Sequence, residues 1–154
     1  MPALTALSTA PSSAATPTPA ELGATLLRLT LGSMWIAHAL LKALVFTLPG
    51  TAQFFDSVGY PGTLAYPVFA LELAGGIALV LGVYARQVAL LLVPVLLGAA
   101  KVHLGNGWVF NAPGGGWEYP VFLALASLVL WLVGDGAFAL HRGRWLAPAF
   151  GAVR

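Results

Sequence analysis

The sequence contains no cysteine, and this absence excludes several kinds of site. A chain without cysteine has no disulfide bond, no thiolate metal centre, no covalently attached c-type haem and no thiol-disulfide relay. We therefore expect no covalent cofactor. Any redox chemistry must depend on a bound substrate or on a partner protein.

Charged residues are also scarce, because Asp, Glu, Lys and Arg make up only 8% of the 154 residues. Apolar residues make up 59%, and the mean hydropathy is +0.88. A water-soluble domain carries about 25% charged residues, so the composition predicts an integral membrane protein in contact with the lipid bilayer. The seven basic residues are scattered and form no basic stripe, so nucleic acid is not expected as a partner.

Four apolar segments each have a length close to the roughly 20 residues that cross a bilayer as a helix. They span residues 23–46, 64–84, 87–104 and 119–140. Turn-forming sequences with Pro and Gly follow the first segment and precede the second and the fourth. We therefore predict an all-α integral membrane protein that folds as a bundle of four transmembrane helices.

Two tails flank the predicted bundle. Residues 1–22 are rich in Ala, Ser, Thr and Pro and lack apolar periodicity, which predicts a disordered tail. No basic region precedes the first apolar segment, so we do not expect it to be cleaved as a signal peptide. Residues 141–154 form a short basic tail.

The basic residues predict the orientation of the bundle. Arg86 lies between the second and third segments, and Arg28 lies near the start of the first. Three further arginines follow the fourth segment, at positions 142, 144 and 154. Lys and Arg accumulate on the cytoplasmic side of membrane proteins. Both termini are therefore expected to face the cytoplasm and the two longer loops to face outward.

Ionisable residues inside the apolar segments form two groups by depth. A charged side chain costs about 2.5 to 3.5 kcal/mol at a helix centre on insertion scales, so it needs a partner or a cavity. Counted at about 1.5 Å per residue, Arg28 and Asp135 lie at a similar depth near the predicted cytoplasmic face. We expect these two residues to form a structural ion pair.

The second group lies in the predicted outer half of the bundle and is called the outer polar group below. His38 and Lys42 are four residues apart and share one face of the first helix, and Glu72 has a similar depth on the second. His103 and Glu118 lie at the outer ends of the third and fourth helices. Small residues beside this group favour close helix packing, which would bring the five side chains to one cavity.

Each member of the outer polar group also has a purely structural alternative. Glu72 and Lys42 would form an ion pair that only holds the bundle together. His38 would bond a neighbouring backbone carbonyl, and His103 and Glu118 would anchor a solvated loop. No metal is expected, because the Glu-x-x-His pattern of di-iron bundles is absent and no two of these residues have ligand spacing.

Three segments resemble the DoxX-like family of small bacterial membrane proteins. The opening helix of that family is similar to LLRLTLGSMWIAHALLK, which contains Arg28, His38 and Lys42. Its Glu-x-x-Gly-Gly helix and Arg-containing turn are similar to ALELAGGIALVLGVYAR, which contains Glu72. Its third helix end and Gly-Gly-x-Glu motif are similar to KVHLGNGWVFNAPGGGWEYP. The resemblance covers roughly residues 23–140.

The resemblance implies a multi-pass protein of the bacterial inner membrane, in a group whose namesakes include a subunit of thiosulfate:quinone oxidoreductase. It implies a quinone-interacting subunit of a redox complex, with a soluble or membrane redox partner and a homo-oligomer as further candidate partners. The ligand-binding residues would be His38, Lys42, Glu72, His103 and Glu118. Glu72 and His38 among them would be catalytic.

Two functions of other classes remain open alternatives. One is a non-catalytic membrane anchor or scaffold for a partner protein, and the other is a transporter of protons or small solutes. No cofactor-binding motif is visible, so the sequence leaves open whether the chain is an enzyme. If it is one, we expect a subunit of a quinone-linked oxidoreductase.

Overall fold

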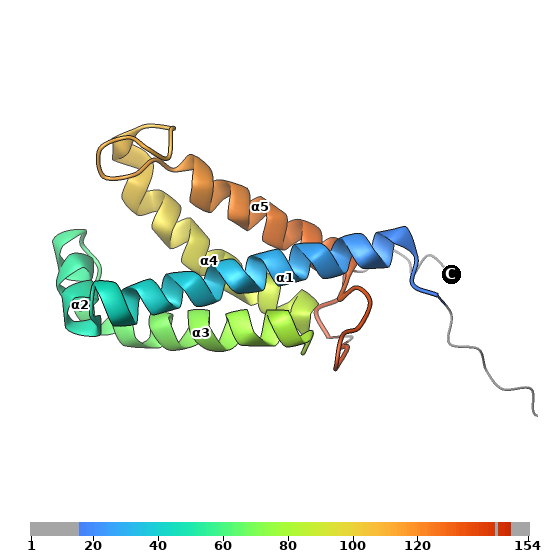
Figure 1. Cartoon of the computed structure of the whole chain (residues 1–154). Coiled ribbons are helices and arrows are strands. Elements are labelled where there is room, and N and C mark those ends of the chain that lie inside the picture. Colours follow the sequence, from blue (N-terminus) through green and yellow to red (C-terminus); the bar gives the residue numbers. More distant parts are fainter. Residues whose placement is uncertain (1–15, 144, 149–154) are drawn as a thin grey trace, which may run out of the picture.

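The computed structural model describes residues 16–143 and 145–148, and the secondary structure of this part of the chain is helical (Figure 1). Within the described ranges there is no named β-strand, and an isolated bridge joins Val83 to His141. In chain order the elements are α1 (Pro19–Leu40), η1 (Leu41–Val45), α2 (Leu48–Ser57), η2 (Gly62–Leu64), α3 (Ala65–Leu81), α4 (Ala85–His103), η3 (Leu104–Asn106) and α5 (Glu118–Val133).

Helix α1 begins at Pro19, four residues before the predicted start. The hydroxyl group of Thr18 accepts the backbone N–H of Glu21, and the Glu21 carboxylate accepts the backbone N–H of Thr18 at 2.9 Å. This capping box satisfies two N–H groups, and Pro19 has none to satisfy. The predicted disordered tail is therefore helical from Pro19 to residue 22, while residues 1–15 lie outside the described part.

Among the residues that the structure describes, three helical stretches are long and apolar enough to cross a membrane, namely Pro19–Val45, Gly62–Leu81 and Ala85–Asn106. They correspond to the first three predicted segments. The fourth, α5, has only 16 residues, which span about 24 Å against a hydrocarbon core of about 30 Å. A helical membrane protein is thus supported, whereas four spans and cytoplasmic termini stay predictions.

Helix α5 ends at Val133, seven residues before the predicted end at residue 140. Gly134 follows with a φ of 104°, a conformation that glycine adopts without steric cost. The chain then turns back toward the α3–α4 turn, where the N–H of His141 donates to the carbonyl of Gly82 at 3.0 Å. The apolar residues after Asp135 therefore cover the end of the bundle instead of extending the helix.

Helix α2 lies in what the sequence predicted to be a loop. The side chain of Thr47 accepts the backbone N–H of Gly50 at 3.2 Å, and Pro49 occupies the first turn, where its missing N–H costs little. The hydroxyl of Thr51 donates to the carbonyl of Lys42 at 3.4 Å. This bond ties the start of α2 to the π-helical turn η1.

The long helices form two pairs, α1 with α3 and α4 with α5. In Figure 1 the pairs converge where α1 begins and α5 ends, and they diverge toward α2 and the loop before α5. Glycines allow the first pair to pack closely, because a Cβ atom on Gly76 would lie 2.9 Å from the carbonyl oxygen of Gly32. The divergence of the pairs leaves room for a cavity between them.

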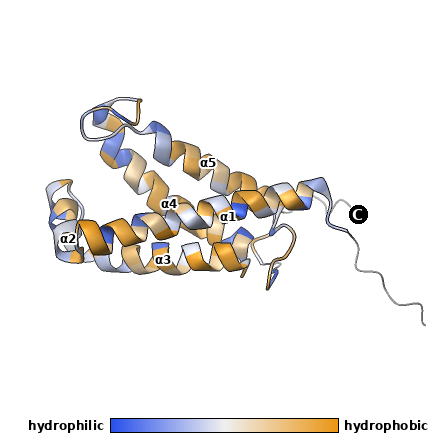
Figure 2. Ribbon diagram, viewed as in Figure 1, coloured by the Kyte–Doolittle hydropathy of each residue, from blue (hydrophilic) through white to orange (hydrophobic). Residues whose placement is uncertain are grey.

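The helices consist largely of apolar residues, which colour much of their ribbon orange in Figure 2, and many of these residues are exposed. Leu26 on α1 and Phe122 on α5 are both 67% exposed, and Leu97 on α4 is 55% exposed. Large apolar residues on every long helix are a poor surface for water and a good one for acyl chains. The exposed surface therefore agrees with a location in a lipid bilayer.

Candidate functional site: a polar cavity between the helix pairs

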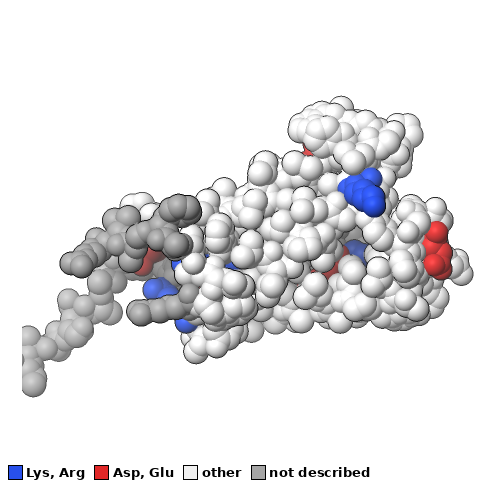
Figure 3. Space-filling model, turned by 180° about the vertical axis from the view of Figure 1, so that it is seen from behind, with Lys and Arg blue, Asp and Glu red and all other residues white. Residues whose placement is uncertain are grey.

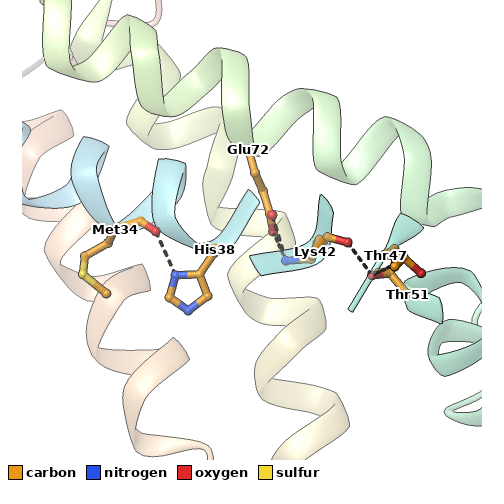
Figure 4. A network of polar contacts seen from close by, with 6 residues as sticks. All are labelled: Met34, His38, Lys42, Thr47, Thr51 and Glu72. Carbon is orange, nitrogen blue, oxygen red and sulfur yellow. Dashed lines mark hydrogen bonds and ion pairs between the residues drawn. The ribbon is translucent and has the colours of Figure 1, made fainter. Parts of the chain in front are cut away.

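An ion pair joins η1, the turn that follows α1, to α3 (Figure 4), and both of its residues line the space between the helix pairs. The Nζ atom of Lys42, on η1, lies 2.8 Å and 3.0 Å from the two carboxylate oxygens of Glu72. The Glu72 side chain is 4% exposed and that of Lys42 is 17% exposed. Two hydrogen bonds from one ammonium group to both oxygens are the geometry that a dry site requires for charges to remain ionised.

The backbone around Lys42 is π-helical, and the N–H of Phe46 donates to the carbonyl of Leu41 at 2.9 Å. A π-helical turn inserts one residue into a helix and rotates the side chains that follow, and such turns are frequent at functional sites. The amphipathic spacing predicted that His38 and Lys42 share a face of one α-helix. The structure instead places Lys42 in the π-helical turn just after α1 ends.

His38 on α1 points into the same space with a fixed ring orientation. Its Nδ1 atom lies 2.8 Å from the carbonyl oxygen of Met34. A carbonyl only accepts hydrogen bonds, so Nδ1 is the donor in this contact, and in a neutral ring the lone pair lies on Nε2. In Figure 4 Nε2 lies on the side of the ring that faces away from Met34. The ring of His38 is thus held by one hydrogen bond at Nδ1, while its Nε2 atom makes no hydrogen bond with any residue that the structure describes.

Tyr119 on α5 stacks against the ring of His38, with centroids 5.9 Å apart and an interplanar angle of 22°. Its hydroxyl group is buried and makes no hydrogen bond with any residue of the described part of the chain. A buried hydroxyl without a partner costs about 1 to 3 kcal/mol. It is therefore a natural contact for a polar ligand atom. Tyr119 was not among the residues predicted to form the site.

His103 and Glu118 both stabilise the loop that precedes α5. The Nδ1 atom of His103 lies 3.0 Å from the carbonyl oxygen of Gly114. A carboxylate oxygen of Glu118 accepts the backbone N–H of Phe110 at 2.8 Å. His103 lines the cavity described next, whereas Glu118 does not.

A cavity of about 800 Å³ lies between the two helix pairs. This volume falls within the range of about 300 to 1,000 Å³ that small-molecule sites occupy. Four of the five residues of the outer polar group line it, and most of its remaining wall is apolar or aromatic. Its lining includes His38, Lys42, Glu72, His103, Tyr60, Tyr119, Trp35, Phe54, Phe55 and Leu96.

The α2 region closes one side of this cavity. Phe54 and Phe55 on α2 and Tyr60 after it contribute aromatic rings to the lining. Lys101 on α4 lies with its Nζ atom 5.6 Å from the centroid of the Tyr60 ring, which is a cation–π contact between α4 and the α2–α3 connection. These aromatic residues could not be placed from the sequence, because α2 itself was not predicted.

The predicted ion pair between Arg28 and Asp135 is not formed. Within the described part of the chain, the pair of Lys42 with Glu72 is the only one with an N–O distance within 4.0 Å. A carboxylate oxygen of Asp135 instead accepts the backbone N–H of Arg86 at 2.8 Å, at the start of α4. The early end of α5 explains the difference, because Asp135 lies after the helix, in a segment that caps α4.

We expect the replacement of Glu118 by alanine to loosen the loop before α5. The backbone N–H of Phe110 would lose its carboxylate acceptor, which is worth about 1 kcal/mol net. Hydrogen exchange at Phe110 should become about fivefold faster. Glu118→Gln, which keeps an acceptor oxygen, is the matched control and should exchange as the wild type does. Unchanged exchange in Glu118→Ala would contradict this role.

The helical fold, the apolar exterior and the polar cavity identify the class of this protein. It is a helical membrane protein with a cavity of ligand size between its helices. A family model described as DoxX matches residues 23–105. The chain is also 36% identical over 121 residues to "Putative oxidoreductase CatD" of Bacillus subtilis (strain 168), a match that covers 78% of this chain and 85% of that protein. This chain belongs to the DoxX family. No solved structure matches it.

Proposed function

We propose that this protein is the quinone-interacting subunit of a redox complex in the bacterial inner membrane, with both termini in the cytoplasm. The observation that carries the proposal is the cavity of about 800 Å³, because it combines aromatic walls with a few converging polar groups. A quinone has matching parts, because its ring and tail are apolar and its two oxygen atoms are polar. The name of the Bacillus subtilis relative, an oxidoreductase, supports the redox assignment.

The polar groups of the cavity match the proton chemistry of a quinone. Conversion between quinone and hydroquinone takes two electrons and two protons. His38 holds a lone pair at Nε2 while its Nδ1–H is bonded to the carbonyl of Met34, so it accepts or returns a proton at one fixed position. The Tyr119 hydroxyl is a second group that donates to or accepts from a ligand oxygen.

Lys42 and Glu72 have a different role in this proposal. Both carboxylate oxygens of Glu72 accept from Lys42, so Glu72 has no proton to give and Lys42 commits two of its three N–H donors to the pair. The pair supplies a fixed dipole beside the ligand in a largely dry site, where electrostatic contacts are strong. We therefore assign proton transfer to His38 and electrostatic positioning to the ion pair. Electrons would come from a partner protein or a soluble substrate, with thiosulfate as the donor that the family resemblance suggests.

One observation favours the anchor function as a second candidate. The ion pair of Lys42 with Glu72 joins η1 to α3 in a closed arrangement, as a purely structural lock would. A membrane anchor would require this ion pair for its stability. It would not require an available Nε2 atom on His38 or a Tyr119 hydroxyl that lacks a partner in the described part of the chain. The two functions therefore differ in what the loss of His38 does.

Native mass spectrometry of the protein released gently from membranes tests the proposal. The wild type is expected to retain quinone, and His38→Ala is expected to retain about tenfold less, because one hydrogen bond and one ring contact are lost. His141→Ala is the matched control, because His141 is exposed and lies outside the cavity lining. It should retain quinone as the wild type does. A chain that carries no quinone, or equal retention by both variants, would contradict the proposal.

A further inference from the structure

A second hollow lies at the other end of the molecule, where α1 begins and α5 ends. Its volume is about 540 Å³, and it is separate from the polar cavity because the two share no lining residue. Its wall comes from the first turns of α1 and α4, the end of α5 and the segment after it. Its lining includes four charged residues and two large apolar ones, namely Glu21, Arg86, Asp135, Arg142, Leu27 and Val133.

Two arginines, Arg86 and Arg142, line this hollow, and both donate to backbone carbonyls, as does Arg28, which lies outside the lining. Arg142 donates to the carbonyl of Gly136 at 2.8 Å, and Arg86 donates to that of Leu132 at 3.4 Å. Arg28 is 2% exposed and reaches the carbonyl of residue 137 at 3.5 Å. Within residues 16–143 and 145–148 none of the three has a carboxylate within 4.0 Å. The hydrogen bonds that these guanidinium groups donate within this part of the chain therefore go to neutral carbonyl groups.

Several guanidinium atoms are buried without a hydrogen-bond partner in the described part of the chain. They are Nε and Nη1 of Arg28 and Nε of Arg86. A buried donor of a charged group that lacks an acceptor is costly. Arg86 lines the hollow directly. An acceptor with negative charge in the hollow would remove part of this cost.

The two carboxylates of the hollow already have other partners. An oxygen of Asp135 accepts the backbone N–H of Arg86 at the start of α4. An oxygen of Glu21 accepts the backbone N–H and the hydroxyl group of Thr18. Two arginines, Arg86 and Arg142, therefore line the hollow beside two carboxylates that are already hydrogen-bonded elsewhere, and the buried Nε donor of Arg86 is left for an incoming acceptor.

The remaining wall of the hollow is apolar and leads away from the arginines along the helices. Ala24 and Leu27 on α1 face Val129 and Val133 on α5. Figure 3 shows basic side chains gathered at this end of the molecule. An anionic head beside arginines, followed by an apolar groove between two helices, matches the shape of a phospholipid. A free phosphate ion would leave the apolar wall without a contact.

We propose that this hollow binds the phosphate of an acidic phospholipid, with Arg86 and Arg142 as its ligands and the acyl chains along α1 and α5. Arginine suits this task because its planar fork of donors fits phosphate oxygens. The site lies at the end that the arginines predict to be cytoplasmic, where acidic lipids attract basic residues. The proposal does not depend on quinone binding in the polar cavity.

The test is lipid titration of the delipidated full-length protein, followed by native mass spectrometry. Phosphatidylglycerol should bind at least about tenfold more tightly than phosphatidylcholine. Arg142→Gln should weaken phosphatidylglycerol binding about fivefold, and Arg86→Gln with Arg142→Gln about 30-fold, at the usual contribution of one basic residue near a lipid surface. Lys101→Gln removes the same charge at the opposite end and should leave binding unchanged.

Three results would overturn the proposal. The first is equal binding of the two lipids by the wild type, and the second is an equal loss of affinity in Lys101→Gln and Arg142→Gln. The third is displacement of phosphatidylglycerol by millimolar inorganic phosphate, which would identify a site for the free ion. Because the Arg142 side chain is exposed and makes a single hydrogen bond, Arg142→Gln keeps the test valid if the double variant fails to fold.

Discussion

Replacement of Glu72 by glutamine is expected to lower the free energy of unfolding by about 3 kcal/mol. Removal of one partner of a buried ion pair costs about 3 to 5 kcal/mol, because the other charge is left in a dry environment. Lys42 is 17% exposed, so part of its charge is still screened, and we place the effect at the lower end of that range. Reversible unfolding in mixed detergent micelles measures this change.

A double variant separates the lost attraction from the cost of the stranded charge. Lys42→Met together with Glu72→Gln removes both charges, and it should recover most of the stability that Glu72→Gln loses. The two single variants and the double variant form a complete mutant cycle. A loss below about 1 kcal/mol in Glu72→Gln would place this pair with exposed ion pairs and contradict its role at the centre of the bundle.

The second large effect is expected from Gly76→Ala, which should destabilise the protein by about 3 kcal/mol. The new Cβ atom would lie 2.9 Å from the carbonyl oxygen of Gly32 and 2.9 Å from the backbone nitrogen of Ile36. Backbone atoms do not move aside as side chains do, so α1 and α3 would have to separate, and overpacking of this kind costs about 1 to 3 kcal/mol. Thermal unfolding in detergent detects the loss.

Gly23→Ala is the matched control for this substitution. Gly23 lies on α1, and nothing is found within 4 Å of the position its Cβ atom would take. Alanine is the better helix former, so this variant should be as stable as the wild type or up to about 1 kcal/mol more stable. If Gly76→Ala behaved in the same way, the close contact between α1 and α3 would be absent in the membrane.

The long helices were predictable because each is a continuous apolar run, and only their ends were misplaced. The start of α1 was missed although Thr18 and Glu21 have the spacing of a capping box. The end of α5 was missed because apolar residues continue after Asp135, and hydrophobicity alone does not distinguish a helix from a covering segment. Helix α2 was missed because Pro49 and Gly50 favour a turn as strongly as a helix start.

The site residues that could be predicted from the sequence are those whose depth along a helix determines where their side chains lie. His38, Glu72 and His103 reach one cavity because the helices carry them to it, as helical spacing indicates. Glu118 was counted with them, yet its side chain turns to the backbone of Phe110, since loop geometry does not follow from spacing. Tyr119 was left out because an aromatic residue at a helix end is typical of the membrane interface.

The measurement that tests the central claim most directly is photolabelling with an azido-quinone in native membranes, followed by peptide mapping. The polar cavity as a quinone site predicts label on residues 94–103 of α4 and on the α2 region that contains Phe54 and Phe55, with competition by unlabelled quinone. Label confined to outward-facing side chains such as Phe122 and Leu26, unaffected by competitor, would contradict the claim, because it would report quinone dissolved in lipid alone.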